Sequence, residues 1–429
     1  MTGPASNLLE HPSLTALTGL LPRFPEVGKT CLVGGAVRDA LLGHPPVDFD
    51  FTSEHDPTPL ARAYAKQCGG HWFWLDEQRR QSRVGIADGT YDFAPWRAPS
   101  LAGDLAARDF SINALALDLA APLAAEALLD PLGGQGDLAA RLLRVAGPRV
   151  LLDDPLRVLK GVRHVAELGL QVDAATLRAM AEAVPALAAV APERVRAEFW
   201  RILTAPQAPL GLTLLAEIGA GEALFSQRFD SEQVSHMVSA WHGTRSTLAG
   251  LTATVPIVAF RLAEPLEQGL SREGLLLWHA VVGQLDPALP QRQARGWRCS
   301  RTTVQRMTAL AAGRELPWHD LRTVPRQARP LCLWALQYGP DPRDLYYLAA
   351  IDKFENIDEP IESCIIEIEK EEVLVNWPPL VDGNWLVACL GLSGPDLGVA
   401  LASVRHAEIR GEVSSLDEAR IFLRANFLK

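Results

Sequence analysis

The sequence has few cysteines and no long apolar run. Its 429 residues include six cysteines, at positions 31, 68, 299, 332, 364 and 389, with no Cys-x-x-Cys pair and no cluster with histidine. This pattern excludes a disulfide-stapled secreted domain and a cysteine–histidine zinc site, and it predicts a reducing, cytoplasmic location. No stretch of about 18 apolar residues occurs, so we expect no membrane span.

Positive charge is scarce, and lysine is scarcer still. The formal net charge is -10, and nearly all of the cations are arginine. A uniformly acidic protein repels nucleic acid, so such a partner would require a local basic surface. Residues 291–329 offer one, with nine arginines against only Glu315 and Asp320; a solvated helix face is the alternative. These arginines are Arg292, Arg295, Arg298, Arg301, Arg306, Arg314, Arg322, Arg326 and Arg329.

Hydrophobic residues make up 48% and charged residues 21%, as in a well-packed globular protein. The chain changes character near residue 151. Before it, short strand-like runs surround a helical stretch; after it, Ala- and Leu-rich segments with a period near 3.6 extend to about 350. We therefore predict an α+β N-terminal part with a small, mostly antiparallel sheet and an all-helical remainder. The expected strands are 47–52, 71–75, 83–87 and 90–94, and the expected first helix is 36–42.

Two aspartates alternate with phenylalanine in the sequence Asp48-Phe49-Asp50-Phe51. On a strand, residues i and i+2 point to the same face, so both carboxylates project together while the phenylalanines face the core. Adjacent carboxylates repel each other unless a cation lies between them, and hard oxygen ligands suit Mg²⁺. Asp92, on a neighbouring strand, is the expected third carboxylate.

A glycine turn, Gly34-Gly35, precedes the helix that carries Arg38. Amides at such a turn bind phosphate, and a guanidinium reinforces that binding. The turn is neither a Walker loop nor a dinucleotide fingerprint, because the required Gly-x-x-x-x-Gly-Lys and Gly-x-Gly-x-x-Gly patterns are absent there. Together with the paired aspartates, it indicates metal-assisted phosphoryl or nucleotidyl transfer.

Five motifs occur in order: LVGGAVRDALLG followed by DFD at 48–50, RDFSINA at 108–114, DPLGG at 130–134 with Asp137-Leu138, DDPLR at 153–157, and Glu193-Arg194 with Glu198. In this order and spacing the chain resembles the bacterial class II tRNA nucleotidyltransferase/poly(A) polymerase family. The resemblance implies a polymerase-beta-like head followed by a helical neck, body and tail.

The resemblance also implies roles for single residues. Asp48 and Asp50 would hold the catalytic metals, and Asp109 would contact the ribose. The full set of implied nucleotide contacts in the head is Gly34, Gly35, Arg38, Arg108, Asp109 and Asn113.

The fourth motif has a physical interpretation of its own. Asp154-Pro155 looks like an N-cap followed by proline at the first helical position, with Arg157 one turn later on the same face. A carboxylate accepts from the cytosine amino group while a guanidinium donates to its ring acceptors, so this pair would select CTP, as it does in the family. The alternative is a capped helix with a surface ion pair. Arg163 would add a nucleotide contact.

The fifth motif is implied to support the fourth. Glu193, Arg194 and Glu198 would brace the base-reading helix and take no part in the chemistry.

Two departures from the family pattern stand out. Ala107 replaces the first arginine of the second motif. Only residues 98–103 separate Arg97 from Asp104, where full CCA-adding relatives carry a flexible loop that acts as a lever toward ATP. The short connection favours an enzyme that adds two cytidines and stops. The alternatives are natural loop variation in a full CCA-adding enzyme, a poly(A) polymerase, and a non-catalytic RNA-binding relative.

We therefore expect tRNA and CTP as partners and Mg²⁺ as cofactor. The expected domains are a head at 1–145, a neck at 146–205, a body at 206–350, an acidic linker at 351–376 and a tail at 377–429.

Overall fold

The computed structural model describes residues 11–46, 48–87, 89–120, 127–322, 324, 328–352, 361–369, 380–390, 394–409 and 412–427. The chain forms two compact units, which are described separately below. The first contains residues 1–190 and 205–228, and the second contains 191–204 and 229–429. No helix among the described residues is both long and apolar enough to cross a membrane. The finer division into head, neck, body, linker and tail stays a prediction.

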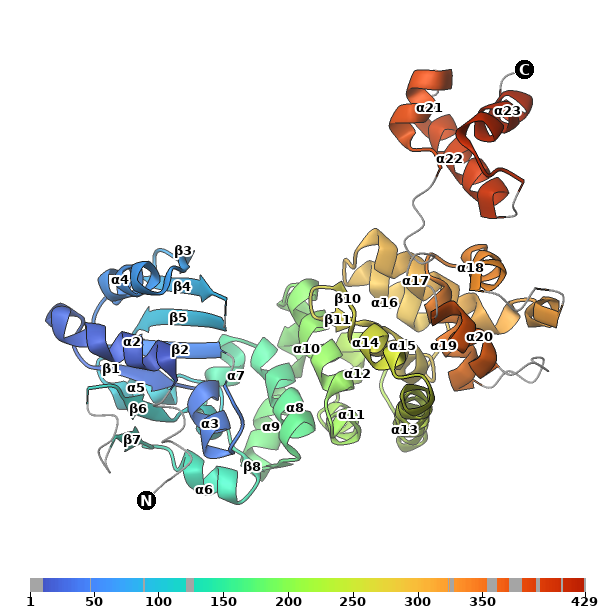
Figure 1. The fold of residues 1–429 in the computed structure, drawn as a ribbon. Helices are drawn as coiled ribbons and strands as arrows, with labels where there is room; N and C mark the ends of the chain where they lie inside the picture. Colours follow the sequence, from blue (N-terminus) through green and yellow to red (C-terminus); the bar gives the residue numbers. More distant parts are fainter. Residues whose placement is uncertain are drawn as a thin grey trace. The chain divides into compact units, whose positions relative to one another are not determined.

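A mixed sheet of seven described strands forms the centre of the first unit, in the order β3-β4-β5-β2-β1-β6-β7 (Figure 1). The predicted antiparallel meander is present in β3, β4 and β5, while β2 and β5 pair in parallel. The mostly antiparallel sheet is thus confirmed. The strands are β1 Thr30–Val33, β2 Asp48–Ser53, β3 His71–Asp76, β4 Gln81–Ile86, β5 Gly89–Pro95, β6 Ala116–Asp118 and β7 Leu128–Leu129.

Aromatic side chains form the core on one face of this sheet. Phe49 stacks on Tyr91 at 5.0 Å between ring centroids, and Phe51 stacks on Phe93, also at 5.0 Å. Tyr64 of α4 (Thr58–Cys68) closes the layer against both β5 rings, and α2 (Pro12–Leu20) packs on α4. Burial of these rings fixes which face of β2 points inward, and therefore which face is left for its aspartates.

The remaining helices of the first unit lie around the sheet and beyond its end (Figure 1). They are α3 Gly35–Leu41, α5 Leu101–Ala106, α6 Gly134–Ala139, α7 Val150–Asp153, α8 Leu156–Leu168, α9 Ala174–Ala183, α11 Ala208–Glu217 and α12 Gly221–Phe225. A short parallel ribbon joins β8 (Leu142–Leu143) to β9 (Gln171–Val172). Gly161 of α8 approaches Phe110 so closely that an added Cβ would lie 2.7 Å from the ring, which seats this helix tightly on the sheet unit.

The described residues of the second unit form helices and one ribbon of β10 (Pro265–Glu267) and β11 (Leu270–Ser271), so the predicted all-helical remainder is mostly helical. Its helices are α10 Pro192–Thr204, α13 Ser231–Thr254, α14 Ile257–Ala263, α15 Arg272–Val282, α16 Leu289–Gly296, α17 Arg301–Ala312, α18 Ala328–Leu336, α19 Pro342–Asp352, α20 Ile361–Glu369, α21 Gly383–Leu390, α22 Gly394–Ile409 and α23 Leu416–Phe427.

The segment interpreted as an acidic linker or exposed helix is in part a packed helix. Residues 353–360 and 370–379 lie outside the described residues, but between them α20 buries Ile361, Ile365 and Ile368. Its Glu369 is buried as well, in an ion pair. The sequence showed isoleucines among glutamates but not what the isoleucines pack against. Their packing in the fold determines that this helix is buried and not exposed.

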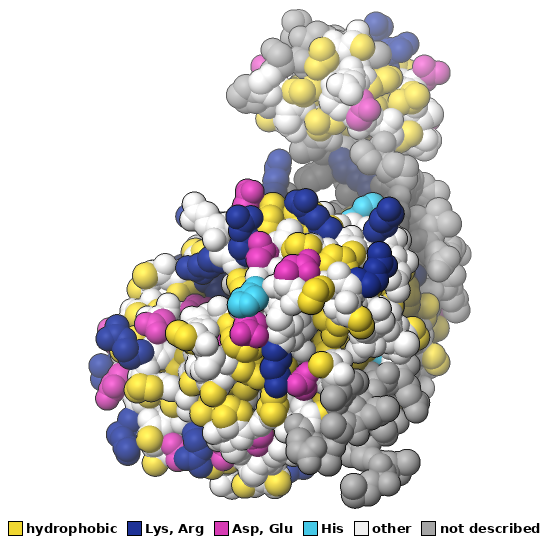
Figure 2. Space-filling view, turned by 90° about the vertical axis from the view of Figure 1, so that its left-hand side faces the viewer, with side chains coloured by type: hydrophobic (Ala, Val, Ile, Leu, Met, Phe, Trp, Pro, Cys, Tyr) yellow, Lys and Arg dark blue, Asp and Glu magenta, His cyan; other side chains and the backbone are white. Residues whose placement is uncertain are grey.

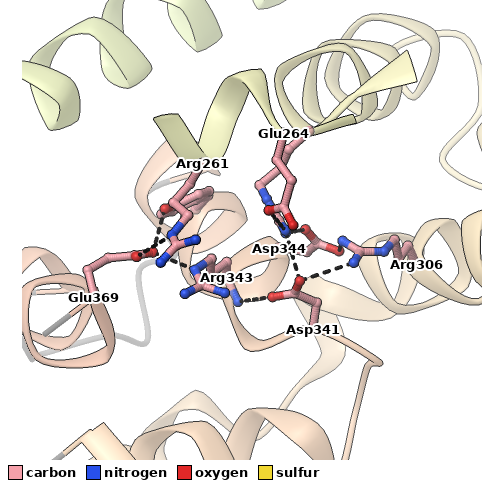
Figure 3. A network of polar contacts seen from close by, with 9 residues as sticks. Arg261, Glu264, Arg306, Asp341, Arg343, Asp344 and Glu369 are labelled. Atoms are coloured by element: carbon pink, nitrogen blue, oxygen red, sulfur yellow. Dashed lines mark hydrogen bonds and ion pairs between the residues drawn. The ribbon is translucent and has the colours of Figure 1, made fainter. Parts of the chain in front are cut away.

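A network of buried ion pairs connects α14, α15, α17, α19 and α20 (Figure 3). Arg272, with no exposed surface, reaches Asp341 at 2.8 Å and also pairs with Asp344. Arg306 bonds the same two aspartates at 3.0 and 2.7 Å. Desolvation raises the pKa of Asp344 even beside these cations. The network is therefore stable only while each charge keeps its partner.

We predict that Arg272→Met destabilises the second unit by about 3–5 kcal/mol, because it removes the fully buried one of the two cations that Asp341 and Asp344 share. Thermal and denaturant unfolding of the full chain measure this loss. The matched control is Arg292→Met, which breaks an exposed pair with Asp286 of 2.6 Å and should change stability by less than about 1 kcal/mol. Equal effects of the two changes would contradict the prediction.

The face shown in Figure 2 carries basic and acidic side chains interspersed with apolar ones. It has no block of a single sign, in keeping with the net charge of -10. A polyanion that approaches this face would therefore meet local groups of arginine and no uniform positive field.

Candidate active site

The two aspartates of β2 lie on the same face of the sheet, as predicted. Their register partners on β5 are Thr90 for Asp48 and Asp92 for Asp50, and both β2 aspartates keep some surface in contact with solvent. Thr90 Oγ1 donates to Asp48 Oδ1 at 2.6 Å, which orients that carboxylate. The intervening Phe49 is buried on the opposite face.

The surroundings of Asp50 disfavour its negative charge and raise its pKa. Desolvation by the surrounding protein raises its pKa, Arg108 opposes that rise, and Asp92 and Asp48 add to it. A cation between the β2 carboxylates would relieve their repulsion. Among the described residues, no group of three or more His, Cys, Asp and Glu is arranged to hold a metal ion. The two aspartates therefore suit an ion that takes most of its ligands from water and phosphate, as Mg²⁺ does.

Asp92 lies where the sequence placed it, next to Asp50 on the same face, but its carboxylate is engaged. Arg83 of β4 donates from Nε and Nη2 to the two carboxylate oxygens at 2.6 and 2.8 Å. A third catalytic carboxylate thus stays a prediction, and Arg83 is a site residue that the sequence analysis missed.

Gly34 forms the turn between β1 and α3 with φ of +78°, a conformation that favours glycine. An added Cβ would lie 3.4 Å from Asp50 Oδ2 and 3.5 Å from Arg108 Nη1, so the turn brings these two groups together. The Gly34 amide donates to the Leu115 carbonyl at 3.2 Å, so it is not free for phosphate, contrary to the expectation for the pair.

Asp104 of α5 holds Arg108 of the second motif in place through hydrogen bonds. It accepts from Arg108 Nη2 at 3.2 Å and from the Arg97 amide at 3.1 Å. The Ser100 hydroxyl caps α5, so the connection from β5 to α5 is short and fixed at both ends. Asp104 is almost fully buried, and nothing in its sequence surroundings distinguished it from a surface aspartate.

Asn113 is hydrogen-bonded to two other implied nucleotide contacts, Arg38 and Asp109. Arg38 Nη1 donates to Asn113 Oδ1 at 2.7 Å, and Asn113 Nδ2 donates to Asp109 Oδ1 at 3.1 Å. Desolvation alone would raise the pKa of Asp109, but the charge of Lys160 and hydrogen bonds from Asn113 and the Phe110 amide outweigh it and lower the pKa. Asp109 is therefore ionised, as a carboxylate that accepts from a ribose hydroxyl should be.

His164 of α8 completes this group and was also missed. Its Nε2 lies 3.0 Å from Asn113 Nδ2, and since that nitrogen can only donate, Nε2 must be the acceptor of a neutral ring. Nδ1 then carries the proton and faces Glu167 at 3.6 Å. Burial lowers the pKa of His164 to about 4. A lone histidine on an apolar helix gives no sequence signal for this contact.

We predict that the first unit loses stability as the pH falls from 6.5 to 4. The unfolded chain takes up a proton at His164 below its ordinary pKa of 6.5, whereas the folded chain does so only near 4, so the loss approaches about 3 kcal/mol. Denaturant unfolding across this range measures it. His164→Gln should flatten the dependence, and His44→Gln, at an exposed histidine, should not; identical slopes for all three proteins would contradict the prediction.

Asp154 and Arg157, which are predicted to read the base, stand just before and at the start of α8. The helix begins at Leu156 with Pro155 as its N-cap, so Asp154 is not the N-cap that the sequence suggested but the extended residue between α7 and α8. Arg157 Nη1 donates to the carbonyls of Ala107 and Val150 at 3.0 and 3.3 Å, which anchors its guanidinium.

The other neck residues make structural contacts. Arg163 is buried and pairs with Glu167 at 3.3 Å. Glu193, on α10 of the second unit, pairs with Arg298 at 3.3 Å. Arg194 and Glu198 lie on the same helix, with Glu198 buried. The nucleotide role of Arg163 and the bracing role of Glu193, Arg194 and Glu198 stay predictions.

Comparison with known proteins agrees with this site. Residues 30–144 match the family model described as "Poly A polymerase head domain", and residues 169–230 match "Probable RNA and SrmB- binding site of polymerase A". A CC-adding tRNA nucleotidyltransferase of Synechocystis sp. is 40% identical over 398 residues, covering 91% of this chain and 92% of the relative. An A-adding tRNA nucleotidyltransferase of Deinococcus radiodurans is 30% identical over 443 residues, covering 94% and 96%.

A solved structure shares the fold. The Bacillus stearothermophilus CCA-adding enzyme in complex with CTP aligns with a TM-score of 0.63 and 23% identity over 96% of this chain and 97% of the other. By its site, its matched domains and its full-length relatives, the chain belongs to the bacterial tRNA nucleotidyltransferase/poly(A) polymerase family.

Proposed function

We propose that the protein adds two cytidines to the 3′ end of tRNA, using CTP and releasing pyrophosphate. The observation that carries this proposal is the shared face of Asp48 and Asp50 beside the Gly34 turn and Arg108. Two neighbouring carboxylates with a repulsion to relieve fit Mg²⁺, which would activate the RNA 3′-hydroxyl and neutralise the leaving pyrophosphate when bound. Because the reaction takes place on tRNA, we expect the protein in the cytoplasm.

The chain's own residues would position the nucleotide. Asp109 accepts from the ribose hydroxyl, while Arg38 and Arg108 face the phosphates. The oxygen of the RNA 3′-hydroxyl forms a bond to the α-phosphorus, the bond to the β-phosphate oxygen breaks, and pyrophosphate carries away the electron pair. Asn113 holds Arg38 and Asp109 at a fixed separation, so one amide aligns both ends of the nucleotide.

Selection of CTP is assigned to Asp154 and Arg157. Arg157 is anchored by two backbone carbonyls, so its remaining donors have a defined direction. The cytosine edge offers an amino group beside two acceptors, which matches one carboxylate and one guanidinium. Uracil and guanine lack the amino group at that position, so they would leave the carboxylate without a donor.

The short connection between β5 and α5 supports addition that stops after cytidine. Ser100 caps α5, and the Arg97 amide donates to Asp104. We therefore expect the segment to be too short and too constrained to move and change the base pocket from CTP to ATP. The Synechocystis relative, named CC-adding, agrees with this choice. Other relatives are named A-adding and CCA-adding. The first alternative is therefore a full CCA-adding enzyme. Less favoured alternatives are an A-adding enzyme, a poly(A) polymerase and a non-catalytic RNA-binding relative.

Binding of tRNA is assigned in part to arginines of the second unit. Arg292, Arg295, Arg298 and Arg301 are exposed on and between α16 and α17. Arg306, counted in the same basic stretch, is instead committed to the buried ion network and is unavailable to RNA. The basic surface is therefore narrower than the sequence suggested. Arg326 lies outside the described residues.

We predict that Asp50→Asn abolishes cytidine incorporation, by more than about a hundredfold, because an amide is a far poorer magnesium ligand than a carboxylate. Binding of tRNA, measured by filter retention, should persist. Asp118→Asn in the same sheet removes an aspartate that pairs with Lys29 and should retain activity. Full incorporation by Asp50→Asn would remove this residue from catalysis.

We predict that tRNA lacking its three terminal nucleotides, incubated with CTP and ATP together, is extended by two cytidines only. Denaturing gels with labelled nucleotide resolve the product length. A single further adenosine would identify a CCA-adding enzyme, and long adenosine tails a poly(A) polymerase. Extension by ATP only of tRNA that already ends in two cytidines would identify an A-adding enzyme.

A further inference from the structure

The outer strand of the sheet presents exposed apolar side chains on the same face as the catalytic aspartates. Across four strands, Phe73 on β3 is the register partner of Arg83, Arg83 of Asp92, and Asp92 of Asp50. Register partners share a face, so these four side chains form one row. Phe73 and the next residue but one, Leu75, form the end of this face at the sheet edge, and we call the two side chains the edge platform.

The opposite face of β3 packs against α4, so Phe73 of the edge platform faces away from that helix. Trp72 packs under the guanidinium of Arg62 from α4, with 4.2 Å between Cζ and the ring centroid. Because side chains alternate along a strand, Phe73 points away from α4, and the exposed side chain of Leu75 follows it at an irregularity of the β3–β4 register. They remain 46% and 47% exposed. Two half-exposed apolar side chains are thus available to a ligand at this sheet edge.

Arg83 connects the edge platform to the catalytic centre. It donates to Asp92 through Nε and Nη2, and its Nη1 has no partner within the part of the chain that is described. The guanidinium is thus held in place with one donor group available. A fixed arginine between an exposed aromatic ring and a metal-binding carboxylate offers a phosphate contact followed by a stacking contact.

We propose that the edge platform binds the single-stranded 3′ end of the RNA primer, with Phe73 stacked on a base upstream of the terminal nucleotide and Arg83 on the phosphate between them. Phe73 is three strand spacings from Asp50, roughly 14 Å, which is too far for the incoming nucleotide and within reach of an upstream residue of the primer. Stacking accepts any base, so the contact serves a primer whose 3′ sequence changes as cytidines are added.

This inference rests on the proposed function, and the test separates the two. An RNA minihelix with 2-aminopurine at its penultimate position is titrated with the full-length protein, and quenching of its fluorescence reports stacking without catalysis. Steady-state incorporation of CTP into the same RNA, without the probe, gives KM for RNA and for CTP separately. The variants are Phe73→Ala, Phe73→Leu and Phe73→Tyr, with Phe260→Ala as control at an exposed phenylalanine of the second unit.

We expect Phe73→Ala and Phe73→Leu to lose quenching and to raise KM for RNA by roughly 5- to 100-fold, the range that corresponds to one stacked base. Phe73→Tyr should behave as wild type. KM for CTP and the melting temperature should stay constant throughout, and Phe260→Ala should retain quenching.

Retained quenching in Phe73→Ala, full function of Phe73→Leu, or an equal effect of Phe260→Ala would each overturn the inference and leave the edge platform as a contact for protein. If quenching is lost in the Phe73 variants but the wild-type protein incorporates no cytidine, the proposed function is refuted and the role of the edge platform in RNA binding is supported.

Discussion

The parallel pairing of β2 with β5 is the constraint on which the active site depends. It places Asp50 beside Asp92 and Asp48 beside Thr90, while the aromatic layer on the opposite face prevents the strand from turning over. A register shift of one residue would bury both carboxylates against α4 and expose Phe49 and Phe51. Hydrophobic burial on one face thus supplies the free energy that holds like charges together on the other.

A second constraint fixes α8 to the part of the first unit that carries Asn113. Gly161 allows α8 to touch Phe110, and His164 then accepts from Asn113. Since Asn113 also bonds Arg38 and Asp109, side chains connect the helix that carries Arg157 to the proposed phosphate and ribose contacts. A rigid connection of this kind suits base selection by protein, because the base-reading residues and the reacting phosphate must keep one geometry.

Arginine has separate uses in the two units of this protein. Arg38, Arg83 and Arg108 lie at the site with acidic partners that orient them, and each keeps its charge near the expected phosphates. In the second unit, by contrast, Arg272 and Arg306 are consumed in a buried network with Asp341 and Asp344. Counting arginines along a stretch of sequence therefore overestimates the basic surface, because burial removes some of them from contact with RNA.

Much of the fold and of the site was determined by the sequence alone. The alternation in Asp48-Phe49-Asp50-Phe51 required a strand with one wet and one buried face, and the glycine pair required a turn before a helix, because both depend only on local geometry. Tertiary structure decided the rest. It paired Asp92 with Arg83, recruited His164 and Asp104, packed α20 against its neighbours and moved the start of α8 past Asp154. Each of these outcomes depends on a partner distant in sequence, and local periodicity carries no information about which distant side chain will arrive.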